Sequence, residues 1–348
     1  MAGEAAAREP IAVGTFCSGT DAPIFALRQA GIPHRHVFSA ETNKHARTFI
    51  QANCPPETLY GDIMTLDLAT VPRVDLFVAG PPCQPYSSLN PNRLKVSHTD
   101  DEAHIDPRIS VLKRCVEYIT LKKPGIAILE NVVQLKKFWT MSESKKRKTD
   151  FEEAWDRFIT PTIRQLHSLY DIHIDILNPR DFSCPQNRPR LYVVIKQTSP
   201  CRTFSFPQRL LPSTTFHHII ERNPSETKEL IPWDKKVLRS YKSFAGVAWT
   251  DRIVGANVLG LNLCRSIVLP KYDYAHCLTT RSLSMVTHLG RYLTRTEMLR
   301  LQGFDYSDMN LLRDNITLNM FGVLIGNAMN VSVLVQVYRQ IQKLEYRY

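Results

Sequence analysis

The chain has 348 residues, 43% of them hydrophobic and 22% charged, which is typical of an ordinary globular protein with one large or two modest domains. Its formal net charge of +11 favours a polyanionic partner such as nucleic acid. The eight cysteines include no C-x-x-C pair and no zinc-finger spacing. No apolar run is long enough to span a bilayer. Residues 1–10 lack the apolar core of a signal peptide. We therefore expect an intracellular protein with reduced thiols, no metal and no membrane partner, located in the nucleus if the source is eukaryotic.

The first segment reads as a strand, a turn and a helix. Residues 11–16 form an apolar run, residues 17–23 contain Gly19 and Pro23, and residues 24–30 have helical spacing that ends at Gly31. This geometry brings backbone N–H groups up to a bound cofactor. The turn matches neither a P-loop nor G-x-G-x-x-G, and many α/β folds begin in this way.

Two acidic residues follow the next elements. A second strand, 36–40, ends at Glu41, which either hydrogen-bonds ribose hydroxyls or is a solvated carboxylate at the start of the helix 43–53. Asp62 lies in a later turn and either accepts from an adenine amine or caps the turn that follows.

A stiff turn holds Cys83 beyond the apolar strand 74–79. Pro81 and Pro82 fix their own φ and restrict the residues before them, and ligands of open α/β sheets bind at such strand ends. Cys83 is therefore placed like a nucleophile, although a lone buried cysteine is more often inert. The polar residues 88–107 predict a long loop of the kind that closes over active sites.

A carboxylate reaches the end of the following strand. The helix 109–121 leads into strand 126–129, which delivers Glu130 and Asn131. Farther on, residues 145–148 are all basic, and this run is a nucleic-acid contact, a nuclear address or a solvated loop.

Two arginines mark the second half of the chain. Arg188 and Arg190 follow a predicted helix, 155–169, and a predicted strand, 172–177. They lie directly before the predicted strand 191–195, and because one residue separates them their side chains project to the same side. They either hold a nucleotide base or phosphate or are surface charges.

The strand–helix alternation stops at about residue 197 and resumes after 277. The basic segment 197–277, with its interleaved aromatics, is a candidate nucleic-acid-reading domain or an accessory domain with its own core. We assign residues 1–196 and 278–348 to one doubly wound α/β domain with a mostly parallel sheet. Thr294 and Glu297 form a capping box, and a final apolar helix, 331–344, should pack against the N-terminal part of this domain.

Taken in order, these motifs resemble the cytosine-C5 DNA methyltransferase family across essentially the whole chain. The matching elements are Phe16 to Gly19, Glu41, Asp62, Pro81 to Gln84, Glu130 to Val132, Gln186 with Arg188 and Arg190, Arg295 to Phe304, and Gly326 to Ala328. One departure concerns the cofactor turn, where Thr20, Asp21 and Ala22 replace the family's further glycines. Asp21 is either excluded from the methionine pocket or meets the methionine ammonium.

The resemblance implies an S-adenosylmethionine-dependent fold and covalent catalysis. Cys83 would attack C6 of a flipped cytosine, Glu130 would engage N3 and the exocyclic amine, and Arg188 and Arg190 would hold the nucleotide. The implied cofactor contacts are Phe16, Ser18, Gly19, Thr20, Asp21, Glu41, Thr42, Asp62, Ile63, Gly80, Asn327 and Ala328. Further substrate contacts would be Gln84, Ser87, Asn131 and Gln186.

The resemblance also implies a monomer acting on double-stranded DNA. One alternative is a tRNA cytosine methyltransferase, disfavoured because the Cys-Phe-Thr element of those relatives is absent. Another is a non-catalytic nucleic-acid-binding protein that keeps the fold.

Overall fold

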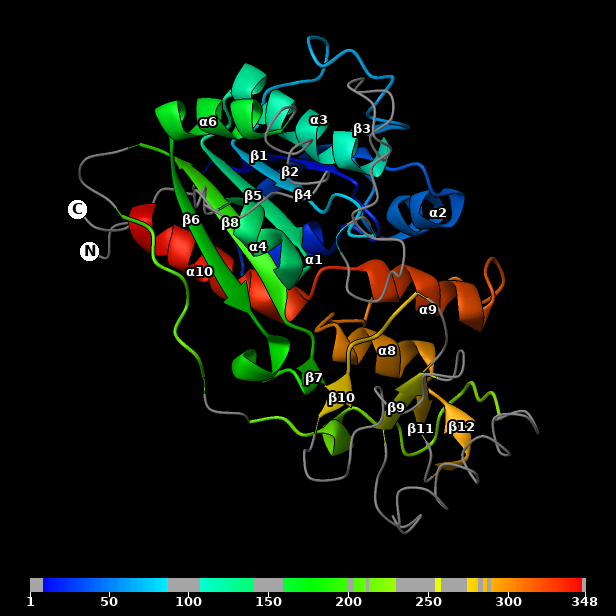
Figure 1. Ribbon diagram of the computed structural model, residues 1–348. Helices are drawn as coiled ribbons and strands as arrows, with labels where there is room; N and C mark the ends of the chain where they lie inside the picture. The colour runs from blue at the N-terminus through cyan, green and yellow to red at the C-terminus, as the bar shows by residue number, and fades with distance from the viewer. Residues whose placement is uncertain are drawn as a thin grey trace, which may run out of the picture.

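The computed structural model describes residues 9–84, 86, 107–139, 159–198, 203–210, 213–229, 254–257, 274–280, 284–286 and 289–345. A seven-stranded sheet in the order β3-β2-β1-β4-β5-β8-β6 forms its centre (Figure 1). The strands are β1 Ile11–Phe16, β2 His34–Ala40, β3 Thr58–Tyr60, β4 Leu76–Ala79, β5 Ile126–Asn131, β6 Tyr170–Leu177 and β8 Arg190–Gln197. All neighbours pair in parallel except β8, which is antiparallel to both β5 and β6. This confirms the predicted doubly wound, mostly parallel fold.

Helices cover both faces of the sheet (Figure 1). Helices α3 Pro107–Lys122 and α6 Thr160–Leu169 pack together on one face, and α1 Ala22–Gln29 packs with α10 Val331–Glu345 on the other. Helix α2 is Lys44–Asn53, and the short elements are η2 Val133–Leu135, α4 Lys136–Trp139, η3 Pro179–Phe182 and η4 Phe216–His218. The contact between α10 and α1 confirms that the last helix returns to the N-terminal part of the chain.

The strands are apolar on both sides because both sides are covered. Along β4, Leu76 and Val78 belong to the core beneath α1 and α10, whereas Phe77 and Ala79 belong to the core beneath α3. This alternation follows from the two-residue repeat of a strand.

The strand order reverses between β1 and β4. The chain runs outward from β1 through β2 to β3, then returns to β4 on the other side of β1 and continues to β5. Ligands of open α/β sheets bind outside the carboxyl ends of the strands at such a switch point. The turns after β1 and β4 therefore lie side by side, and Gly80 N donates to Phe16 O at 3.4 Å.

A smaller part lies beyond this end of the sheet (Figure 1). It contains the strands β7 Gln186–Asn187, β9 Val254–Asn257, β10 Ala275–His276, β11 Ser284–Val286 and β12 Arg291–Tyr292, with helices α8 Arg295–Leu301 and α9 Leu318–Asn327. Strand β11 pairs with both β9 and β12, so segments from either side of the predicted boundary at 277 share one sheet. The division into two domains stays a prediction, since most of 197–277 lies outside the described residues.

The structure contains elements that the sequence did not predict, among them the short strand β3 and the helix α9. Helix α6 begins at Thr160, and residues 155–158 of the predicted helix lie outside the described residues. The stretch Leu318–Leu344, which contains α9 and α10, is long and apolar enough to cross a membrane by length and composition, so the expectation that no run is long enough is wrong. Its most apolar window is 72% buried, and the helix breaks at Ala328, so here it is packed as core.

Candidate active site

Cys83 lies just beyond β4, in the turn that begins with Gly80, Pro81 and Pro82. Its thiol is partly exposed, and its carbonyl accepts from the backbone N of Tyr86 at 3.0 Å. The strand register pairs Ala79 with Leu129, so this turn lies beside the end of β5.

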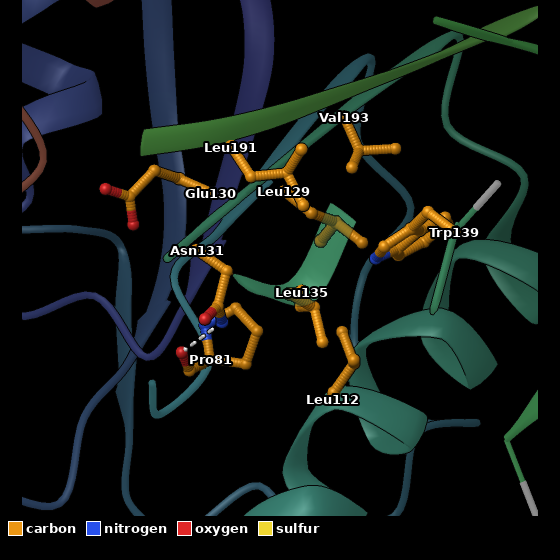
Figure 2. Close-up of a pocket in the computed structure, with 9 residues that line it drawn as sticks. All are labelled: Pro81, Leu112, Leu129, Glu130, Asn131, Leu135, Trp139, Leu191 and Val193. Atoms are coloured by element: carbon orange, nitrogen blue, oxygen red, sulfur yellow. Dashed lines mark hydrogen bonds between the residues drawn. The ribbon is translucent and has the colours of Figure 1, made fainter. Parts of the chain in front are cut away.

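Asn131 ties the Cys83 turn to β5. Its Nδ2 donates to the carbonyl of Pro81 at 2.9 Å, as Figure 2 shows, and its Oδ1 accepts from Val132 N at 2.8 Å. Asn131 is buried, and its observed contacts are therefore within the protein, although the sequence predicts a substrate contact. A side chain anchored in this way restricts where the Cys83 turn can move.

Glu130 and Arg190 meet across the β5–β8 pair. Glu130 is opposite Tyr192, and Arg190 lies two residues before Tyr192 on the same face. As a result, Arg190 Nε lies 3.4 Å from Glu130 Oε1, with the two side chains 18% and 12% exposed. Glu130 Oε1 has no hydrogen-bond partner among the described residues, so this buried acceptor is open to a ligand.

The charges of this group act on one another. Burial raises the pKa of Glu130, and the charges of Arg190 and Arg188 only partly oppose that rise. Burial also raises the pKa of the Cys83 thiol, and the charge of Glu130 adds to the rise, while Arg190 and Arg188 lower it. The site therefore shifts the Glu130 carboxyl group toward its protonated form and the Cys83 side chain toward the thiol.

Arg188 has a different environment from Arg190. It is 3% exposed, and its guanidinium donates to the carbonyls of Leu278, Gly326 and Ala328, each at 2.9 Å. These contacts join the segment after β10 to the end of α9. The sequence predicts that Arg188 holds the target nucleotide, but its observed partners are all protein groups.

Cys277 also belongs to this group, although it is not among the predicted site residues. Its Sγ accepts from Arg188 Nη1 at 3.1 Å and from Arg190 Nη2 at 3.4 Å. Burial would raise the pKa of this thiol, but the two arginines outweigh that effect and lower it. No local motif signals Cys277, because both arginines come from a distant part of the chain.

Gln186 is fully buried rather than facing a substrate. Its Nε2 donates to Leu301 O at 2.6 Å, and its Oε1 accepts from Leu278 N at 3.3 Å. A direct substrate contact would require these bonds to break. Gln84 is exposed beside Cys83, whereas Ser87, the loop 88–106 and the basic run 145–148 lie outside the described residues.

The predicted cofactor residues gather at the ends of β1, β2 and β3. Glu41 follows β2, and its Oε2 accepts from the backbone N of Gly19 at 2.7 Å. Gly19 has φ 56, in the left-handed region, and a side chain there would meet no atom within 4 Å. Thr42 and Asp62 are exposed, and Asp62 Oδ1 accepts from Met64 N at 2.9 Å.

Other members of the predicted cofactor set are buried. Phe16 is packed against Phe77 and Tyr118, with ring centroids 5.1 Å apart in each pair, so its side chain belongs to the core. Ile63 and Ala328 are also buried, whereas Asn327 is exposed at the end of α9. A side chain added at Gly80 would come within 2.9 Å of Met329, so the 326–329 segment closely approaches the Cys83 turn.

The polar groups at these strand ends fit a nucleoside-bearing cofactor. Carboxylates after β2 and β3 suit ribose hydroxyls and an adenine amine. The buried Oγ1 of Thr20 has no partner among the described residues, which leaves a hydroxyl in the turn available to a ligand. The same residues contain no group of three metal-ligating side chains.

A small apolar cavity lies behind β5, lined mainly by Leu112, Leu129, Leu135 and Trp139 (Figure 2). The Glu130 carboxylate points away from this cavity in Figure 2. The cavity is therefore a packing feature of the core, and Pro81, Glu130 and Asn131 border it on the side of the Cys83 turn.

Comparisons with known proteins agree with this geometry. A family model described as C-5 cytosine-specific DNA methylase matches residues 12–343. The Type II methyltransferase M.NlaX of Neisseria lactamica is 29% identical over 316 residues, covering 88% of each chain. The Type II methyltransferase M.NgoBI of Neisseria gonorrhoeae is 28% identical over 306 residues, covering 86% of this chain and 83% of that protein. The structure of the S. pombe Dnmt2 methyltransferase has a TM-score of 0.67 at 18% identity, covering 97% of this chain and all of that one, which supports the fold.

Proposed function

Because this chain belongs to the C-5 cytosine-specific DNA methylase family, and is a DNA cytosine-5-methyltransferase, we propose that its catalytic group is Cys83, Glu130 and Arg190. The observation that carries the assignment is the 3.4 Å approach of Arg190 Nε to Glu130 Oε1, beside the Cys83 turn that Asn131 holds to β5. Thiol, carboxyl and guanidinium groups from three separate segments meet at the ligand-binding end of the sheet.

Cys83 forms a bond to C6 of the target cytosine. Addition of a thiolate at C6 turns the unreactive C5 into an enamine-like carbon that attacks an electrophilic methyl group. A water molecule then takes the proton from C5, and the electrons of that C–H bond form the C5–C6 double bond as Cys83 leaves as a thiolate. Burial raises the pKa of Cys83, and the positive charges of Arg190 and Arg188 oppose this rise in favour of the thiolate.

Glu130 donates a proton toward N3 of the base. A carboxyl group can do this only when protonated, and burial raises the pKa of Glu130 in the required direction. Protonation at N3 balances the charge that the attacking thiolate brings into the ring. Glu130 Oε1, which receives no hydrogen bond from the described residues, is the acceptor for the exocyclic amine.

The family uses S-adenosylmethionine, which supplies the electrophilic methyl group on its sulfonium. We place its ribose on Glu41 and its adenine near Asp62, with the Gly19 turn and Asn327 completing the site. The residues Ser18, Thr20, Thr42, Ile63, Gly80 and Ala328 line or shape the same region.

The substrate is double-stranded DNA. A base inside a duplex is out of reach of Cys83, so the target cytosine must be flipped out of the stack. The net charge of +11 supports binding to the phosphate backbone, and the segment 197–277 is the candidate reader of sequence. The enzyme acts as a monomer inside the cell, and location in a nucleus stays a prediction.

The decisive experiment tests covalent chemistry directly. Duplex DNA containing 5-fluorocytosine blocks the final elimination, so the wild type should form a denaturant-stable adduct in the presence of S-adenosylmethionine. Cys83→Ser should form no adduct and transfer no labelled methyl group. Cys115→Ala, which removes a buried thiol from α3, should form the adduct as the wild type does. Full methyl transfer by Cys83→Ser would contradict the assignment.

The same assay separates DNA from tRNA. Labelled methyl transfer is measured with duplex DNA and bulk tRNA present together. Label recovered in DNA supports the proposal, and label recovered only in tRNA would instead favour the tRNA alternative.

A further inference from the structure

The turn after β1 contains three residues in the left-handed region, and only one of them is a glycine. Cys17 and Asp21 have φ 51, and Gly19 has φ 56. Asp21 is the N-cap of α1, yet its side chain makes no capping hydrogen bond to that helix. The Asp21 carboxylate is therefore used elsewhere.

The carboxylate of Asp21 connects β1, which precedes the cofactor turn, with the neighbouring strand β2. Oδ1 accepts from Thr15 Oγ1 at 2.6 Å, and Oδ2 accepts from Ser39 Oγ at 2.5 Å. Thr15 in β1 and Ser39 in β2 are register partners, so one side chain joins both strands next to their carboxyl ends.

The hydrogen bonds continue from Thr15 into the turn. Ser18 Oγ lies 2.6 Å from Thr15 Oγ1 and accepts from Ala40 N at 3.1 Å. Because the Thr15 hydroxyl donates to Asp21, Ser18 is the donor to Thr15. The Ser18 hydroxyl also lies 3.2 Å from the carbonyl oxygens of Thr15 and Ala40, and these contacts together fix the residue immediately before Gly19.

Among the described residues, no lysine or arginine forms an ion pair with the Asp21 carboxylate. It is fully buried, and among the described residues its one ion-pair contact is His36 Nε2 at 3.6 Å. The other titratable groups whose charges interact with that of Asp21 are Glu41, Cys54 and Tyr338. Burial lowers the pKa of His36 to about 4, so this imidazole is neutral at physiological pH.

We propose that Asp21 is a positioning residue for cofactor binding, whose ionised carboxylate holds the Ser18–Gly19 turn in its binding shape. This inference rests on the proposed function, because it assigns the turn to S-adenosylmethionine. A turn rich in glycine loses conformational freedom when its ligand binds, whereas this turn is already ordered by the Asp21 hydrogen bonds. Such ordering before binding increases affinity.

The test compares cofactor binding in two variants at position 21. Asp21→Gly keeps a residue suited to the left-handed conformation and removes every side-chain bond. Asp21→Asn keeps the size and shape of the side chain and one acceptor oxygen, but it replaces the other acceptor oxygen with an amide group that donates. Calorimetric titration with S-adenosylmethionine and with S-adenosylhomocysteine, without DNA, should show affinity at least about tenfold weaker in Asp21→Gly and intermediate in Asp21→Asn.

Two further readouts separate positioning from general stability. At saturating cofactor and DNA, Asp21→Gly should keep a kcat near that of the wild type while its KM for S-adenosylmethionine rises. The affinity of the wild type should weaken as the pH falls through about 7, where Asp21 becomes protonated, and the affinity of Asp21→Asn should lose that step. Glu297→Gln, which alters another fully buried carboxylate in α8, should lower the melting temperature and leave cofactor affinity unchanged.

The outcomes distinguish this inference from the proposed function. If the wild type binds no S-adenosylmethionine, the proposed function fails. If the wild type binds and Asp21→Gly binds equally well, or if Glu297→Gln loses affinity in proportion to its loss of stability, only the role of Asp21 fails. If Asp21→Gly does not fold, cofactor titrations of Asp21→Asn and Ser39→Ala test the role of Asp21. Each of these variants weakens the hydrogen bonds of Asp21 and keeps a polar side chain at position 21.

Discussion

Arg190 Nε lies 3.4 Å from Glu130 Oε1, and this guanidinium also lowers the pKa of the Cys83 thiol. Arg190→Gln removes a positive charge that favours the ionised form of both groups, so the pKa values of Cys83 and Glu130 should rise together. The reactive form needs Cys83 as the thiolate and Glu130 as the carboxyl group, so both limits of the pH profile of kcat/KM follow these two pKa values. The whole profile should therefore move to higher pH.

Methyl transfer measured across a pH series checks this shift. Arg209→Gln, which removes an arginine whose side chain is 80% exposed and which pairs with Asp181, is the matched control and should leave the profile in place. A profile for Arg190→Gln that falls in height without moving would show that Arg190 does not set these ionisations.

Arg188 should matter for stability more than for nucleotide binding. Its guanidinium joins the carbonyls of Leu278, Gly326 and Ala328, and a lysine ammonium lacks the fork needed to reach all three. We expect Arg188→Lys to lower the free energy of unfolding by about 3 kcal/mol, measured by urea titration. Unchanged stability together with a raised KM for DNA would restore the role in nucleotide binding that the sequence predicts.

Cys277 should be ionised at a lower pH than an ordinary thiol. Arg188 and Arg190 donate to its Sγ and lower its pKa. In a titration followed by the ultraviolet absorbance of thiolate, the wild type should show one thiol that ionises at a lower pH than an ordinary thiol, and Cys277→Ser should lack that step. Cys184→Ser serves as the control, because burial raises the pKa of Cys184 to about 11. Identical curves for the wild type and Cys277→Ser would contradict the assignment.

Gly326 is placed where α9 touches the segment after β10. A side chain there would lie 2.7 Å from the carbonyl oxygen of Thr279, which belongs to the backbone and cannot swing aside. Gly326→Ala should therefore lower the free energy of unfolding by about 1–3 kcal/mol. Gly61→Ala, where the added carbon meets nothing within 4 Å, is the control in the same thermal unfolding measurement.

Asp21 should make stability depend on pH in an unusual direction. Burial raises its pKa from 3.8 to about 7, so the native state binds this proton more tightly than the unfolded state does. The resulting contribution to stability is fully present below about pH 3.8 and is lost as the pH rises to about 7. Asp21→Asn should thus gain stability relative to the wild type across that window, by up to about 4 kcal/mol. Urea titrations on both sides of the window measure it, and a constant difference between the two proteins would rule it out.

The sequence determined the elements whose signals are local. The strand β1 and the helix α2 end within a residue of their predicted limits, because apolar runs and their bounding turns lie in consecutive residues. The capping box of Thr294 and Glu297 is confirmed for the same reason, since its partners are three residues apart. The placement of Cys83 and Glu130 at neighbouring strand ends follows equally from strand patterns in a parallel sheet.

Only the tertiary structure decided what the buried polar groups contact. Arg188 and Arg190 look alike in sequence, but Arg188 is surrounded by carbonyls from 278–328 whereas Arg190 reaches Glu130. Cys277 joins them from 89 residues away, and Asp21 reaches Thr15 and Ser39 instead of its own helix. The physical reason is that a buried donor or acceptor must be satisfied by whichever group the packing of distant segments brings within hydrogen-bond distance. The order of residues along the chain does not record which group that is.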